Sequence, residues 1–93
     1  MPTPPDITES EWAIMEVLWN RAPQTAAEIS KARRRSTGWA QNTVRTLLSR
    51  LVEKGALRAK DNTAGVREFS PAVEREVCVR AESESFLQRV FQG

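Results

Sequence analysis

The segment 39–55 limits the possible folds of this chain most strongly, because it has the pattern of an amphipathic helix with a marked end. Its apolar side chains recur at the i, i+3, i+4, i+7 spacing of a helix that buries one face. They are Val44, Leu47, Leu48 and Leu51. Gly55 follows where a left-handed C-terminal cap is expected. The sequence therefore predicts a helix over about 41–54, and no residue at its start is a good N-cap.

The other face of this helix carries amide, hydroxyl and guanidinium groups. Such groups match the donor and acceptor patterns of base edges in the major groove of DNA, while the apolar stripe attaches the helix to its domain. We expect four base-contacting residues near the start of the helix: Asn42, Thr43, Arg45 and Thr46. An ordinary solvated helix face is the alternative interpretation of these four residues.

Two capping boxes precede this helix. Thr8 with Glu11 predicts a helix over about 9–20, and Thr25 with Glu28 opens a second, shorter helix that ends near 33–35. A turn is expected at Ser36, Thr37 and Gly38. The first helix is expected to turn four residues toward the core: Trp12, Met15, Leu18 and Trp19.

A β-hairpin and a last helix are predicted downstream. The segments 57–60 and 66–69 have the character of short strands on either side of a turn-rich stretch, and Pro71 is expected to end the second strand. Helical spacing returns over about 73–91. The predicted fold is mainly α with a small β-hairpin: a winged helix-turn-helix of three helices plus a wing, followed by a C-terminal helix.

Composition argues against an enzyme. The 93 residues contain no histidine and one cysteine, Cys78. The usual general base at neutral pH and most zinc ligands are therefore missing, and no internal disulfide is possible. We expect no cofactor and no metal. No apolar run is long enough to insert into a membrane and no secretory signal is visible, so we expect a cytoplasmic protein.

Charge is strongly segregated along the chain. Residues 1–30 carry one basic and five acidic residues, 31–60 carry nine basic and one acidic, and 61–93 carry four basic and six acidic. The basic third is the candidate surface for DNA phosphates, and an ordinary solvated surface is the alternative for 33–35. The expected phosphate contacts, with one more on the wing, are Trp39, Gln41, Arg50, Lys54, Arg58, Lys60 and Arg67. A purely structural role is the alternative for Trp39.

Several separated motifs resemble the penicillinase and methicillin-resistance repressor (BlaI/MecI) family of winged-helix regulators. They occur in the family's order over nearly the whole chain: Ile7–Trp12, Val17–Trp19, Trp39 with Asn42–Val44, Thr46–Leu51, Lys54–Leu57, Phe69–Pro71 and Ser85–Gly93. The resemblance implies a repressor that blocks transcription by occupying a two-fold symmetric operator in double-stranded DNA as a homodimer. A membrane sensor that triggers cleavage of the repressor is implied as a further partner.

The same resemblance suggests how the chain is divided. We expect a DNA-binding domain over 1–71, and over 72–93 a C-terminal helix that begins a dimerisation region shorter than in the family. An apolar stripe on this helix is assigned to the dimer contact: Val79, Phe86, Leu87, Val90 and Phe91. Packing of the stripe on the first helix is the alternative. The competing function is a winged-helix protein-protein interaction module without DNA binding.

Overall fold

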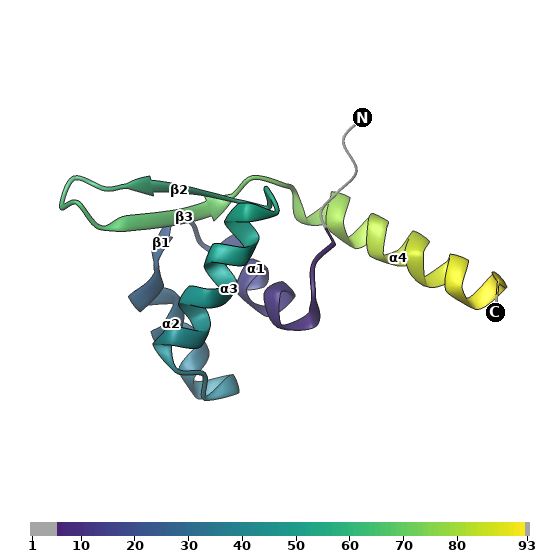
Figure 1. The fold of residues 1–93 in the computed structure, drawn as a ribbon, viewed down its shortest axis with the longest axis horizontal. Helices are drawn as coiled ribbons and strands as arrows, with labels where there is room; N and C mark the ends of the chain where they lie inside the picture. The colour runs from purple at the N-terminus through teal and green to yellow at the C-terminus, as the bar shows by residue number, and fades with distance from the viewer. Residues whose placement is uncertain (1–5, 93) are drawn as a thin grey trace.

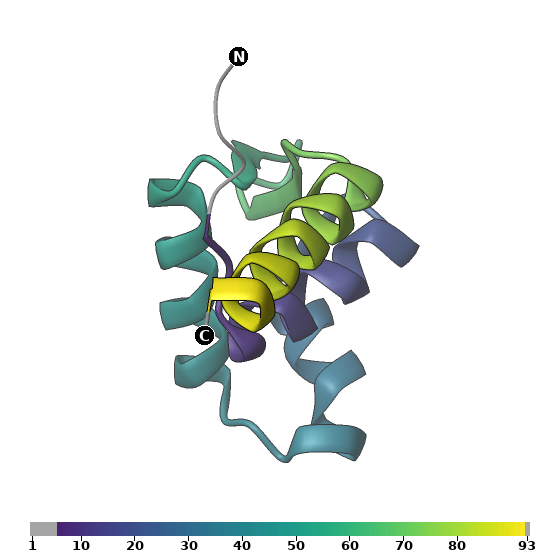
Figure 2. The same ribbon diagram turned by 90° about the vertical axis from the view of Figure 1, so that its right-hand side faces the viewer.

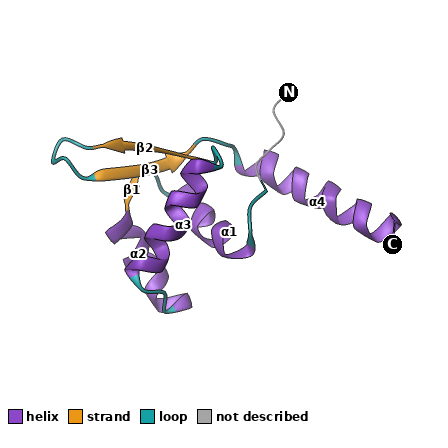
Figure 3. Ribbon diagram, in the orientation of Figure 1, coloured by secondary structure: helices purple, strands orange, loops and turns teal. Residues whose placement is uncertain are grey.

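The computed structural model describes residues 6–92, without the side chains of 34–37, 85, 86, 88, 89, 91 and 92. This part of the chain forms a helical N-terminal part, a β-hairpin and a C-terminal helix (Figures 1 and 3). Their order is α1 (Glu9–Asn20), β1 (Gln24–Thr25), α2 (Ala26–Thr37), α3 (Gln41–Glu53), β2 (Leu57–Asp61), β3 (Arg67–Pro71) and α4 (Arg75–Gln92). The predicted class, a winged helix-turn-helix followed by a C-terminal helix, is confirmed.

Both predicted capping boxes are formed. At α1 the backbone N–H of Glu11 donates to Thr8 Oγ1 at 3.2 Å, and the Glu11 carboxylate accepts from the Thr8 N–H at 2.9 Å. Thr25 and Glu28 make the same pair of bonds at the start of α2, again at 3.2 and 2.9 Å. The expectation that α2 is the shorter helix is wrong, because it has 12 residues, as α1 does, and includes Thr37. Its Lys and Arg residues favour helix, so only Gly38, at φ +69°, ends it.

The bounds of α3 agree closely with the prediction. Ala40 occupies its N-cap position and makes no side-chain capping bond. At the other end Gly55 has φ +82°, its N–H donates to the carbonyl of Val52, and the N–H of Ala56 donates to the carbonyl of Leu51. This pair of bonds is a Schellman motif, which satisfies carbonyls that the end of the helix would leave unpaired.

The sheet has three strands in the order β1-β3-β2, all antiparallel. The predicted hairpin is present, with β2 and β3 in register from Leu57 opposite Pro71 to Asp61 opposite Arg67. Pro71 is the last residue of β3, because a strand end tolerates the missing N–H. Strand β1 was not predicted, since two residues are too few to show a periodic pattern.

The core lies between α1, α2, α3 and the base of the sheet. Its buried residues are Ile14, Met15, Leu18, Ile29, Val44, Leu47, Leu48, Leu51, Ala56, Leu57 and Phe69. Trp19 is partly buried and packs against this core, as predicted, whereas Trp12 is only partly buried and is not part of it. Ile14, which was not predicted, is fully buried. The two indole rings meet edge to face at 5.4 Å. Both indole N–H groups have acceptors, the carboxylate of Glu16 for Trp12 and the carbonyl of Val73 for Trp19, which favours partial exposure of the rings.

Helix α4 is attached to the body at its first turns and then extends away from it (Figures 1 and 2). Arg75 Nε lies 2.9 Å from the Glu16 carboxylate of α1, and Cys78 is buried. Farther along, Leu87 and Val90 leave 50% and 57% of their side chains exposed. Among the described helices, none combines the length and the apolar character needed to cross a lipid bilayer.

Candidate nucleic-acid interface

The predicted base-contacting residues are all exposed on α3, but they point in different directions. A rotation of about 100° per residue places Asn42 and Thr46 outward, opposite the buried stripe, and Thr43 on one flank of the helix. Arg45 lies on the other flank, which faces α2 and the sheet. The Thr46 hydroxyl donates to the Asn42 carbonyl at 3.0 Å, so this hydroxyl already has a partner within the helix.

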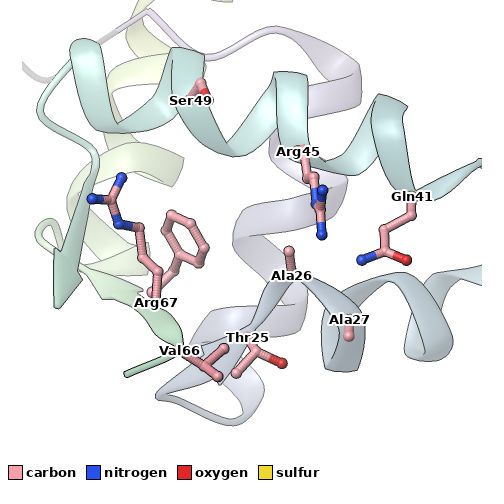
Figure 4. A pocket seen from close by; sticks show the side chains of 9 residues that line it. Thr25, Ala26, Ala27, Gln41, Arg45, Ser49, Val66 and Arg67 are labelled. Carbon is pink, nitrogen blue, oxygen red and sulfur yellow. The ribbon is translucent and has the colours of Figure 1, made fainter. Parts of the chain in front are cut away.

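A groove of about 350 Å³ lies between the first turn of α2, one side of α3 and the beginning of β3 (Figure 4). Its lining residues are Thr25, Ala26, Ala27, Gln41, Arg45, Ser49, Val66, Arg67 and Phe69. Arg45 and Arg67 line it from two different elements. In Figure 4 the guanidinium group of Arg45 points from α3 toward α2, whereas that of Arg67 points away from Arg45 on the wing side. We refer to this site as the groove.

The wing divides its basic residues between two faces. Successive side chains of a strand point to opposite sides, so Arg67 lies on the same face as the buried Phe69 and next to the groove. Arg58 and Lys60 of β2 lie opposite Ser70 and Glu68 and therefore share the other face. Arg67 is 3.9 Å from Asp61, and both side chains are about two-thirds exposed. Such a pair holds an arginine only weakly.

Lys54 forms a salt bridge with a buried carboxylate of its own domain. Its ammonium group lies 2.5 Å from the carboxylate of Glu11 and donates to the carbonyl of Asp6 at 2.7 Å. Glu11 is only 1% exposed. Burial raises the pKa of Glu11, but hydrogen bonds from Lys54 and Thr8 lower it by more, so the net pKa lies below the ordinary value. This pair joins α1 to the end of α3, and we leave Lys54 out of the DNA surface proposed below.

Trp39 and Arg50 lie outside the groove. Trp39 is partly buried against the core, and the guanidinium of Arg33 lies 5.8 Å from the centroid of its ring. The ring therefore has a structural role whether or not it also meets a phosphate. Arg50 is exposed, and the helical rotation places it on the same flank as Thr43. The residues predicted to contact DNA are thus spread over the groove, several sides of α3 and both faces of the wing.

The groove also contains residues that the sequence analysis missed. Ser49 is four residues from Arg45, so helical spacing could have identified it. Thr25 and Ala27 line the groove only because β1 pairs with β3 and brings the start of α2 to the wing. No sequence signal for that pairing is visible. Val66, predicted to begin the second strand, lies one residue before β3.

No group of three or more His, Cys, Asp or Glu side chains among the described residues is placed to hold a metal ion. Burial raises the pKa of the Cys78 thiol, as expected for a small side chain packed in an apolar site. Neither a metal site nor a reactive thiol is therefore added to the groove by the described residues.

The model of the penicillinase repressor family matches residues 7–93. The chain belongs to the penicillinase repressor family. This family consists of transcriptional repressors, so the prediction that the chain is not an enzyme is confirmed.

Curated relatives within the penicillinase repressor family are similar along nearly the whole chain. The penicillinase repressor of Bacillus licheniformis is 29% identical over 89 residues, which are 96% of this chain and 69% of that protein. The methicillin resistance regulatory protein MecI of Mammaliicoccus sciuri is also 29% identical over 89 residues, which are 95% of this chain and 71% of that protein.

A solved structure from the same family has the same fold. It is the solution structure of the monomeric form of Bacillus licheniformis BlaI in complex with the blaP half-operator. It is similar with a TM-score of 0.70 and 27% identity, covering 83% of this chain and 93% of that one.

Proposed function

We propose that this chain is a sequence-specific repressor domain that binds double-stranded operator DNA with α3 and the groove beside it. One observation carries the proposal: Arg45 of α3 and Arg67 of the wing line the same groove from two elements. Arginine side chains on the helix and on the wing beside one groove suit a phosphate backbone that runs along both elements. The family membership and the half-operator complex of the related BlaI support the same conclusion.

In this proposal some exposed residues of α3 contact base edges and others contact the DNA backbone. Asn42 and Thr46, which face outward, are positioned for base edges in the major groove, where an amide suits adenine and a methyl group suits thymine. Arg45 can reach a guanine or, from the groove, a phosphate. Thr43 and Arg50 would meet the DNA on the opposite flank of α3. Phosphate contacts by Gln41 and Arg67 would set the register without reading sequence.

We further propose that the repressor acts as a homodimer that occludes a two-fold symmetric operator. In this proposal residues 1–71 form the DNA-binding domain, and 72–93 begin the dimerisation region. Support comes from α4, where Val79, Leu87 and Val90 are apolar and exposed. The side chains of Phe86 and Phe91, which complete the predicted stripe, lie outside the described residues. Inactivation through a membrane sensor remains a proposal from the family resemblance.

The test begins with a selection of duplexes from a random-sequence pool, using the wild-type chain. Affinities for the recovered duplex are then measured by fluorescence anisotropy. Arg45→Ala should weaken binding by about 1–3 kcal/mol, with a relaxed sequence preference if Arg45 contacts a guanine and an unchanged preference if it contacts a phosphate. Arg80→Ala is the matched control, because Arg80 is an exposed arginine of α4. If no duplex is retained at low salt, the chain is better explained as a protein-protein interaction module.

A further inference from the structure

Val66 is an exposed apolar side chain at the mouth of the groove. It precedes β3 directly, lines the groove together with Arg45 and Arg67, and leaves 49% of its surface exposed. Figure 4 shows its side chain beside that of Thr25, on the wing side of the groove. Single exposed apolar residues are common on protein surfaces, so exposure alone gives no function. The presence of Val66 in the same groove as two arginines is what calls for an explanation.

The backbone around Val66 is held by the side chain of Asn62. The amide oxygen of Asn62 accepts from the backbone N–H of Ala64 at 2.9 Å and from that of Val66 at 3.0 Å. The N–H of Asn62 donates to the carbonyl of Val66 at 2.8 Å, which closes the hairpin. Gly65 adopts φ +77°, a conformation that glycine reaches without strain. Val66 is therefore presented by a turn with most of its backbone groups paired.

The groove is apolar around this side chain. Ala26, Ala27 and Phe69 line it, so the two arginines supply its cationic ends and the valine part of an apolar wall. A DNA strand that passes through the groove would place its phosphates near the arginines and its C–H groups against the valine. DNA offers two such apolar surfaces, the deoxyribose edge and the thymine methyl group.

Resting on the DNA binding proposed above, we propose that Val66 is an apolar DNA contact which packs against such a C–H surface and contributes to operator preference. Asn62 acts through Val66 as a positioning residue and does not itself contact a phosphate. The contact is hydrophobic, so it adds affinity without releasing counterions.

The experiment compares three variants on the duplex recovered by selection with the wild-type chain. Val66→Ala removes two methyl groups and should weaken binding about three- to tenfold, with the salt dependence unchanged. Val66→Thr keeps the shape of the side chain but replaces one methyl by a hydroxyl, and should also weaken binding. Val77→Ala is the control, because Val77 is another exposed valine, 39% exposed on α4, and should bind as the wild type does.

Replacing single thymines of the duplex by deoxyuracil distinguishes the two sources of the C–H surface. If Val66 contacts a thymine methyl group, one replacement lowers the affinity of the wild type for the duplex and leaves the affinity of Val66→Ala unchanged. If it meets deoxyribose, no replacement affects the difference between the two proteins. Both results support the contact, and a double-mutant cycle measures its strength.

The outcomes also separate the two proposals. If the wild type binds the duplex and Val66→Ala binds it equally well, the Val66 contact is overturned and the DNA-binding proposal stands. Equal affinity of Val66→Thr and wild type overturns its apolar character. If the wild type retains no duplex, both proposals fail. Thermal unfolding of each variant confirms that exposed substitutions leave the fold in place.

Discussion

At the scale of single residues, the wing distinguishes two arginines that look alike in the sequence. Arg67 lines the groove, whereas Arg58 lies on the other face of the hairpin. We therefore expect Arg67→Ala to weaken binding of the selected duplex and to reduce the slope of log affinity against log salt by about 1. Arg58→Ala should change both quantities much less. Anisotropy titrations at several salt concentrations measure this, and equal effects of the two variants would contradict the assignment of faces.

Because of Glu11, the free energy of unfolding should depend on pH in the acid range. Its pKa is lowered in the folded protein, so the unfolded chain binds more protons as the pH falls toward 4.5 and below. The stabilisation is complete above the unfolded pKa and is lost as the pH falls through the folded pKa. Glu11→Gln should cost about 1–3 kcal/mol near neutral pH and flatten this acid dependence. Urea unfolding across the acid range tests it, and an unchanged pH profile would count against the role of Glu11.

Lys54 provides a complementary test, because its sequence-based role and its structural role predict different results. Lys54→Met removes the partner of the buried Glu11 and should lower the free energy of unfolding by about 1–3 kcal/mol. The salt dependence of DNA binding should stay as in the wild type. A reduced salt slope without a loss of stability would instead support the phosphate contact that the sequence suggested.

At the scale of elements, the wing depends on one amide side chain. Asn62→Ala removes the acceptor for two backbone N–H groups and should loosen the turn that leads into β3. Amide hydrogen exchange at Ala64 and Val66 should become faster, while the α1 and α3 amides keep their protection. Asn62→Asp, which retains the acceptor oxygen, is the control. Unchanged exchange in the alanine variant would show that the turn is held by other bonds.

The elements also show how far the sequence was informative. The capping boxes, the stripe of α3 and Gly55 are local signals, and each predicted its feature within a few residues. The end of α2 was misplaced because helix-favouring residues continue past the expected turn. Strand β1 has only two residues, and its pairing with β3 is a tertiary contact.

The same distinction holds for the site. The polar face of α3 could be predicted because helical spacing is local. That Arg67 and Arg58 lie on different faces depends on the strand register. The pairing of Lys54 with Glu11 joins residues far apart in the sequence, and no local pattern indicates it.

At the scale of the whole molecule, α4 gives the test of assembly. Leu87→Ser should weaken self-association by about tenfold or more if the exposed stripe forms the dimer contact, because it removes a large apolar side chain. Sedimentation equilibrium over a range of protein concentrations measures this. Arg80→Ser, on the same helix, is the control. Equal association of Leu87→Ser and wild type would place the dimer contact elsewhere.

Strand β1, short as it is, connects the two sides of the groove. Gln24 pairs with Phe69 and Thr25 with Glu68, and α2 starts at the next residue. Moving the wing away from α2 would break these backbone bonds, so the position of the wing relative to the first turn of α2 is set before any duplex arrives. Complex formation should then require little backbone rearrangement, and its rate should be governed by diffusion and long-range electrostatic attraction rather than by a slow opening step.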